Sequence, residues 1–144
     1  MKIKNFFYKN KKRLFLVNTI GIIFDPKVRR ILIGKRGKDK YVPKLRWSFP
    51  GGVPFLGKDI ESSLELKMKE KTGLKVKSLG SVFARIPKEK KNLILIYYLC
   101  EVISGKEKPG KDILELKWVK PGELKKYFTT SLDPRLEEYI MNLK

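Results

Sequence analysis

One segment, residues 47–76, constrains the fold of this chain more than any other. It opens with Trp-Ser-Phe-Pro-Gly-Gly, so that a short predicted strand over residues 45–49 is followed by Pro50 and by the pair Gly51 and Gly52. Proline and glycine are the strongest local signals for the end of a regular element. The segment therefore predicts a strand that is closed by Pro50, Gly51 and Gly52.

A helix is predicted directly downstream, over residues 59–71. Its apolar side chains recur at four-residue steps, which places them in one stripe on a helical surface. The stripe consists of Ile60, Leu64 and Met68. Gly73 follows the last turn, where glycine commonly ends a helix. We therefore expect one buried helical face and a helix that stops at this glycine.

The rest of the chain predicts one α/β domain over residues 1–144, without repeats or low-complexity linkers. Apolar, β-branched runs predict strands over residues 14–24, 30–34, 75–86, 93–103 and 113–119. The run over 93–103 is almost wholly apolar, which is typical of a central strand. Pro121 and Pro134 each stand where a helix is expected to begin.

The segment resembles the Nudix box, G-x5-E-x7-R-E-U-x-E-E-x-G-U, in which U is an aliphatic residue. The frame matches without a gap from Gly52 to Leu74. Further along, residues 115–119 read Glu-Leu-Lys-Trp-Val and precede Pro121, which is similar to the family's terminal E-x-x-W-V strand and the helix after it. The resemblance implies a Nudix-like α/β/α sandwich with a mixed central sheet.

The charged residues inside the box depart from the family pattern. Its four glutamate positions hold Lys58, Lys67, Glu70 and Lys71, and its arginine position holds Leu66. In Nudix enzymes the box glutamates hold Mg²⁺, which bridges the pyrophosphate of a nucleoside diphosphate derivative and activates water. An ammonium group donates hydrogen bonds but cannot coordinate a metal. The resemblance thus implies the fold. From the lysines in the box we expect the pyrophosphohydrolase activity to be lost, and we expect no cofactor.

The alternative to loss of activity is an active hydrolase whose magnesium site has fewer acidic ligands, a reduced metal site. Nudix enzymes often recruit an acid from a loop or a late strand, which would supply a missing ligand. Glu89, Glu101 and Glu115 are the acids outside the box that this would use, and Glu101 is expected at a solvent-facing strand end. Glu70, the only retained box acid, and Glu115 are the candidate magnesium ligands. Magnesium is expected only if this alternative holds.

The net charge of +19 is concentrated in the first third of the chain. Residues 1–50 carry 15 Lys or Arg against 2 acids, with clusters at 9–13, 29–30 and 35–46 and Tyr41 and Trp47 in or beside the last. Such a field attracts phosphate backbones. Lysine enrichment also occurs in thermophile proteins, but there glutamate accompanies it. A polyanionic partner and a merely solubilising surface both remain open.

Cysteine and histidine usage excludes several classes of protein. Histidine is absent, which excludes a Ser-His-Asp or Cys-His catalytic centre. Cys100 is the only cysteine and lies in an apolar run, so it is expected to be a buried thiol.

No signal peptide and no apolar run long enough to span a bilayer is evident. A cytoplasmic protein without a membrane partner is expected.

Three functions remain open at this stage. The first is a catalytically silent Nudix domain that binds a phosphorylated small molecule through Lys58, Lys67 and Lys71, although lysines on a helix can also be simply solvated. The second is a module that binds nucleic acid or a ribonucleoprotein, and the third is a hydrolase with the reduced metal site. The other candidate ligand-binding residues are Gly51, Gly52, Arg46 and Trp47. The ligand and the oligomeric state are not predicted.

Overall fold

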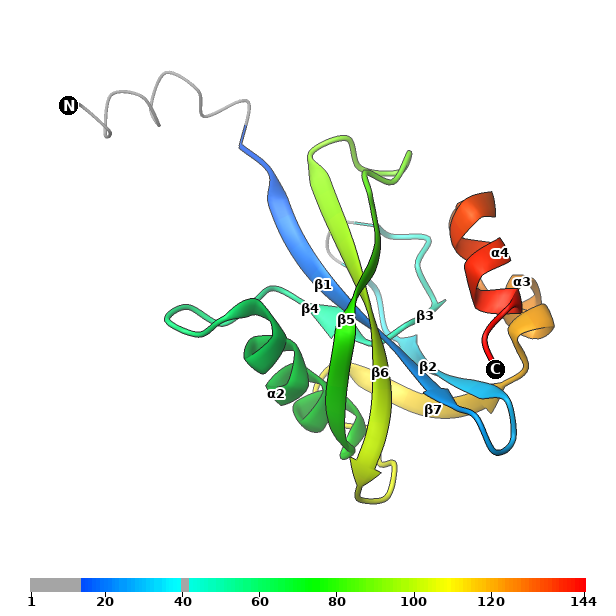
Figure 1. Cartoon of the computed structure of the whole chain (residues 1–144). Coiled ribbons are helices and arrows are strands. Elements are labelled where there is room, and N and C mark those ends of the chain that lie inside the picture. The colour runs from blue at the N-terminus through cyan, green and yellow to red at the C-terminus, as the bar shows by residue number, and fades with distance from the viewer. Residues whose placement is uncertain (1–13, 40–41) are drawn as a thin grey trace.

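The computed structural model describes residues 14–39 and 42–144. Seven strands form a mixed sheet in the order β3-β2-β1-β6-β5, with β4 paired to β1 and β7 paired to β2 (Figure 1). The strands are β1 (Leu16–Asp25), β2 (Arg30–Arg36), β3 (Trp47–Ser48), β4 (Gly51–Gly52), β5 (Lys75–Arg85), β6 (Leu93–Ser104) and β7 (Ile113–Val119). The basic cluster predicted at residues 9–13 and the aromatic Tyr41 lie outside the described residues.

Strand β6 lies between β1 and β5, which confirms the central place predicted for residues 93–103. It pairs with β1 in parallel, from Leu16 opposite Leu93 to Ile23 opposite Cys100, and with β5 antiparallel. The parallel pair joins segments that are far apart in the sequence. The sheet is therefore mixed, as the family resemblance implied.

Helices cover both faces of the sheet. Helix α2 (Ile60–Thr72) packs on one face, and the short helices η2 (Pro121–Glu123), α3 (Leu124–Tyr127) and α4 (Pro134–Met141) lie on the other side (Figure 1). Strand residues alternate between the two layers because successive side chains point to opposite faces. Ile22 packs in the cluster that holds Leu136, whereas Ile23 packs with Met68 of α2. The predicted α/β/α sandwich is confirmed.

The buried stripe of α2 is shorter than predicted. Leu64 and Met68 are fully buried, but the side chain of Ile60 is 45% exposed, so its assignment to the stripe is wrong. Ile60 is the first residue of the helix and follows an exposed loop, where the sheet no longer covers it.

Burial of Cys100 is confirmed, and it raises the pKa of the thiol to about 12. Within residues 14–39 and 42–144, none of the helices has the length and apolar character needed to cross a membrane.

Candidate functional site

A cavity of about 300 Å³ lies where β1, β3 and β4 meet the second half of α2. Its walls include the loop between β5 and β6, the segment that joins β3 to β4, and the segment that joins α3 to α4. The predicted site residues among its lining are Trp47, Gly51, Gly52, Lys67, Glu70 and Lys71. The structure therefore gathers most of the predicted set around one space.

Local signals fix the rotation and the ends of α2. The Asp59 carboxylate accepts a hydrogen bond from the Ser62 backbone N–H at 2.7 Å, and Gly73 ends the helix with φ at 77°. Met68 packs so closely on β1 that a Cβ at Gly21 would lie 2.5 Å from its sulfur. Met68 faces the sheet. The neighbouring α2 residues Lys67, Glu70 and Lys71 border the cavity beside it.

Lys71 is the most unusual of these neighbours. Its side chain is 6% exposed, although its place in the lining shows that it borders the cavity. Among the described residues, no hydrogen bond or ion pair holds its ammonium group, and the nitrogen itself keeps some access to solvent. Burial lowers the pKa of Lys71, the nearby Arg36 lowers it further, and the carboxylate of Asp112 opposes this effect. The cavity thus contains a buried cation without a direct counter-ion.

The side chains of Lys67 and Lys71 both pass over Gly52. A Cβ placed on this glycine would lie 3.5 Å from the Lys71 Nζ and 3.5 Å from the Lys67 Cδ. The Lys67 ammonium lies 4.1 Å from the centre of the Phe55 ring, a cation–π contact. Glu70 reaches the cavity from the same helix, so one carboxylate lies among these cations.

The glycine pair follows the end of β3, as predicted, but it also forms a strand of its own. Gly51 and Gly52 are the short strand β4, paired opposite Ile20 and Thr19 of β1. A Cβ at Gly51 would lie 2.6 Å from the backbone oxygen of Thr19, which explains why this position requires glycine. The predicted strand does end before Pro50, as β3, but the strand formed by the glycine pair was not predicted because this backbone pairing connects segments that are distant in the sequence.

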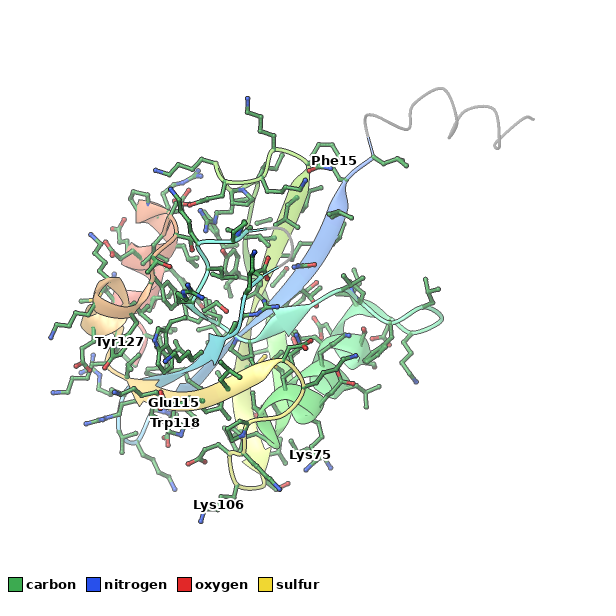
Figure 2. The ribbon with its side chains drawn as sticks, turned by 180° about the vertical axis from the view of Figure 1, so that it is seen from behind. Phe15, Lys75, Lys106, Glu115, Trp118 and Tyr127 are labelled. Carbon is green, nitrogen blue, oxygen red and sulfur yellow. The ribbon has the colours of Figure 1, made fainter. Side chains whose placement is uncertain are left out.

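Three predicted site residues lie away from the cavity. Lys58 is exposed on the loop before α2, and Arg46 is exposed beside β3. Glu115 is exposed on β7, opposite Lys35 of β2 (Figure 2). Trp47, in contrast, lines the cavity, and its ring packs edge-on against Tyr127 at 5.4 Å. The cavity therefore includes the box residues Lys67, Glu70 and Lys71 of α2 but not Lys58.

Sequence reasoning missed the contribution of the loop between β6 and β7. Backbone N–H groups of Lys108 and Gly110 donate to the Thr72 and Lys71 carbonyls at 2.8 and 2.9 Å. A Cβ at Gly110 would overlap the Glu70 carbonyl oxygen, so glycine allows the loop to reach the end of α2. The residues that follow, Lys111 and Asp112, consequently line the cavity. The adjacent Pro109 and Gly110 are a local turn signal that was not used, and such a signal does not say where the turn lies in the fold.

The far wall of the cavity holds a hydrogen-bonded charge network. The Arg85 guanidinium donates to the Tyr97 hydroxyl at 3.1 Å and to the Ser131 backbone oxygen at 2.9 Å. The Glu89 carboxylate accepts from the backbone N–H and the hydroxyl of Ser131, each at 2.7 Å. Burial alone would raise the pKa of Glu89, but the hydrogen bonds from Ser131 outweigh it, so the pKa is lowered. Of these residues only Glu89 was named from the sequence.

Comparison with models of known protein families shows to which family the chain belongs. A family model described as a NUDIX domain matches residues 14–142. The chain belongs to the Nudix family. The comparison with curated proteins gave no match.

Solved structures of Nudix proteins share the fold. The Escherichia coli ORF135 protein is 20% identical, with 91% of each chain covered and a TM-score of 0.67. A MutT protein from Methanosarcina mazei is 14% identical, with 90% of this chain and 92% of the other covered and a TM-score of 0.66. An ADP-ribose pyrophosphatase from Streptococcus suis is 18% identical, with 74% of each chain covered and a TM-score of 0.59. At these identities the similarity concerns the fold.

The donor set at the box does not match the magnesium site that Nudix enzymes use. Divalent magnesium requires oxygen ligands, and the box contributes one carboxylate, Glu70, beside the ammonium groups of Lys67 and Lys71. Within the described part of the chain, no three acidic, cysteine or histidine side chains gather closely enough to hold a metal ion. A cation at the box repels a second cation and attracts an anion. The described residues at the box therefore do not fit the magnesium site of the family.

Proposed function

We propose that this Nudix domain binds a phosphorylated small molecule in the cavity through cationic side chains and without magnesium-dependent hydrolysis. The observation that carries the proposal is Lys71, a buried cation that borders the cavity without a direct counter-ion. Shielding a charged side chain from most of its surrounding water is unfavourable unless a partner compensates for it. An anion bound in the cavity would supply that partner.

Other side chains support an anionic ligand at the same place. Lys67, Arg36 and Lys111 line the cavity together with Lys71. Arg36 also pairs with Asp39 at 3.2 Å, which leaves the lysines as the cations available for a ligand. Lysine binds phosphate as a point charge. Two or three ammonium groups around one cavity can offset the two charges of a diphosphate.

The remaining walls suit an organic group attached to the phosphates. Trp47, Phe49 and Phe128 line the cavity, and the rings of Phe49 and Phe128 pack edge to face at 5.1 Å. A volume of about 300 Å³ lies at the lower end of the range for small-molecule pockets. The Streptococcus suis relative is an ADP-ribose pyrophosphatase. We therefore propose a nucleoside diphosphate derivative as the ligand class.

Calorimetric titration with ADP and with ADP-ribose tests this function. Each ligand is titrated in EDTA and in magnesium, into the native protein, Lys71→Met and the matched control Lys75→Met. Lys75 is exposed at the start of β5 (Figure 2) and does not line the cavity. We expect equal affinity in EDTA and magnesium, and weaker binding only for Lys71→Met. Binding that requires magnesium, or that Lys71→Met leaves unchanged, would contradict the proposal.

Two alternative functions give different results in parallel assays. Magnesium-dependent release of a monophosphate from ADP-ribose or capped RNA, abolished by Glu70→Gln, would establish the reduced metal site. Binding of short RNA with a steep salt dependence, together with no binding of ADP, would favour the nucleic-acid module. Lys58 and Arg46 are exposed outside the cavity, so their role as ligand residues stays a prediction that this RNA assay addresses.

A further inference from the structure

The environment of Lys71 suits chemistry beyond the attraction of an anion. The amine is reachable from the cavity, because Gly52 has no side chain and a Cβ there would lie 3.5 Å from Nζ. The rest of the Lys71 side chain is shielded from solvent. No hydrogen bond or ion pair within residues 14–39 and 42–144 occupies the nitrogen. The nitrogen is therefore free to form a bond with a molecule in the cavity.

The neighbours of Lys71 favour the uncharged, nucleophilic form of its amine. Burial and the charges of Arg36 and Lys67 lower its pKa, against the opposing effects of Asp112 and Glu70. Lysines become nucleophiles when they are desolvated or placed beside another cation. The Lys67 ammonium, by comparison, lies over the Phe55 ring and faces an aromatic surface. Lys71 thus differs from the other cavity lysines in both shielding and surroundings.

We propose that Lys71 forms a reversible imine with phosphorylated aldehydes, whose phosphate is held by Lys67 and Lys111. The inference rests on the proposed function, because the same cavity cations position the phosphate. The lone pair of Nζ attacks the carbonyl carbon and forms a C–N bond, and the carbonyl oxygen takes up a proton. The resulting hydroxyl takes up a second proton and leaves as water, the nitrogen gives up its two protons in balance, and its lone pair completes the C=N bond. No oxidant or reductant is required.

Pyridoxal 5′-phosphate is a suitable probe, because it carries an aldehyde and a phosphate on one ring. The native protein, Lys71→Arg and the control Lys75→Arg are incubated with a limiting amount of the probe. Borohydride then reduces any imine to a stable amine, and peptide mass spectrometry locates it. Lys71→Arg keeps a cation in the cavity but removes the nucleophile. Thermal unfolding of each variant verifies that it is folded.

We expect Lys71 to be modified at least about tenfold faster than Lys75, since activation of the amine and placement of the phosphate both act there. Pyridoxal, which lacks the phosphate, should react more slowly at Lys71, and ADP should protect this residue. Modification spread evenly over the exposed lysines would overturn the inference. So would equal rates with pyridoxal and its phosphate.

The same variants separate this inference from the proposed function. If ADP binds to the native protein by calorimetry while Lys71 acquires no adduct, the imine is excluded and the proposed function stands. If Lys71 is the preferred site of the adduct but ADP does not bind, the proposed function fails and the reactive lysine stands. Lys71→Arg keeps a positive charge but has no nucleophilic amine, so loss of the adduct in this variant distinguishes a nucleophile from a counter-charge.

Discussion

The two ends of the cavity differ in whether their charged side chains have hydrogen-bond partners. At the far wall, Arg85 and Glu89 are joined through the backbone and hydroxyl of Ser131, so each charge has hydrogen-bond partners. At the box helix, Lys71 is buried without such a partner among the described residues. Buried polar groups normally stabilise a fold when they are satisfied and destabilise it when they are not. We interpret the first end as structural support and the second as the binding end.

Breaking the far wall should have the largest effect on stability. Arg85→Leu removes the donors to Tyr97 and Ser131, and we expect the free energy of unfolding to fall by about 2 kcal/mol. Urea unfolding measures this change. The control Arg135→Leu removes an exposed ion pair with Asp133 and should cost less than about 0.5 kcal/mol. Equal losses in both variants would mean that the far wall is not a structural network.

Removing the charge at the box end should weaken binding without weakening the fold. Lys71→Met keeps the length and apolar body of the side chain but removes the charge. We expect the affinity for ADP to fall by about tenfold, or about 1.4 kcal/mol. The protein itself should become slightly more stable, because an uncompensated buried charge is gone. Loss of stability in this variant, measured by urea unfolding, would show that Lys71 has a structural partner.

The glycine pair allows a finer test of the same contrast. A Cβ at Gly52 would meet the Lys67 and Lys71 side chains at ordinary contact distance, 3.5 Å, whereas a Cβ at Gly51 would lie 2.6 Å from the Thr19 oxygen. Gly52→Ala should therefore weaken ADP binding by about threefold with little loss of stability. Gly51→Ala should instead destabilise the sheet, so it serves as the comparison in thermal unfolding. Reversed outcomes would contradict the assignment of Gly52 to the site.

The smallest effect concerns the pH dependence of stability. The pKa of Lys71 in the folded protein lies below its ordinary value of 10.5. Below the folded pKa both states are protonated, and the destabilisation by the buried charge is complete. As the pH rises from the folded pKa towards 10.5, the native state releases a proton that the unfolded chain keeps, so the free energy of unfolding rises.

Urea unfolding of the native protein and Lys71→Met over a range of alkaline pH measures this trend. The stability advantage of Lys71→Met should shrink as the pH increases through that window. An advantage that grows with pH would mean that the pKa of Lys71 is raised, as it would be beside a carboxylate partner.

Local sequence signals predicted the fold better than the site. The helix over residues 59–71 is found at Ile60–Thr72, since Asp59 and Gly73 act on the backbone within one turn. Ile60 was misplaced because periodicity alone does not say where the sheet stops covering a helix. The frame from Gly52 to Leu74 likewise placed Lys67, Glu70 and Lys71 at the cavity. These residues share one helix, whose geometry is regular.

The rest of the site depends on contacts that no local pattern encodes. Arg85 and Ser131 are 46 positions apart and come together only when the segment after α3 folds over the sheet. Lys111 and Asp112 reach the cavity because their loop satisfies carbonyl groups at the end of α2. Lys58 matches the motif frame but occupies an exposed loop that carries it away from the cavity. Spacing fixes positions on a helix, whereas loops follow tertiary packing.

The parallel pairing of β1 with β6 has a consequence for how the protein folds. Asn18 and Ile20 of β1 line the cavity together with Leu93 and Leu95 of β6. A chain must close a long loop before such a pair can form, and parallel pairing of distant segments is intrinsically slow. The cavity can therefore exist only after the two halves of the chain have met. Capture of a ligand during refolding would report the completion of the sheet.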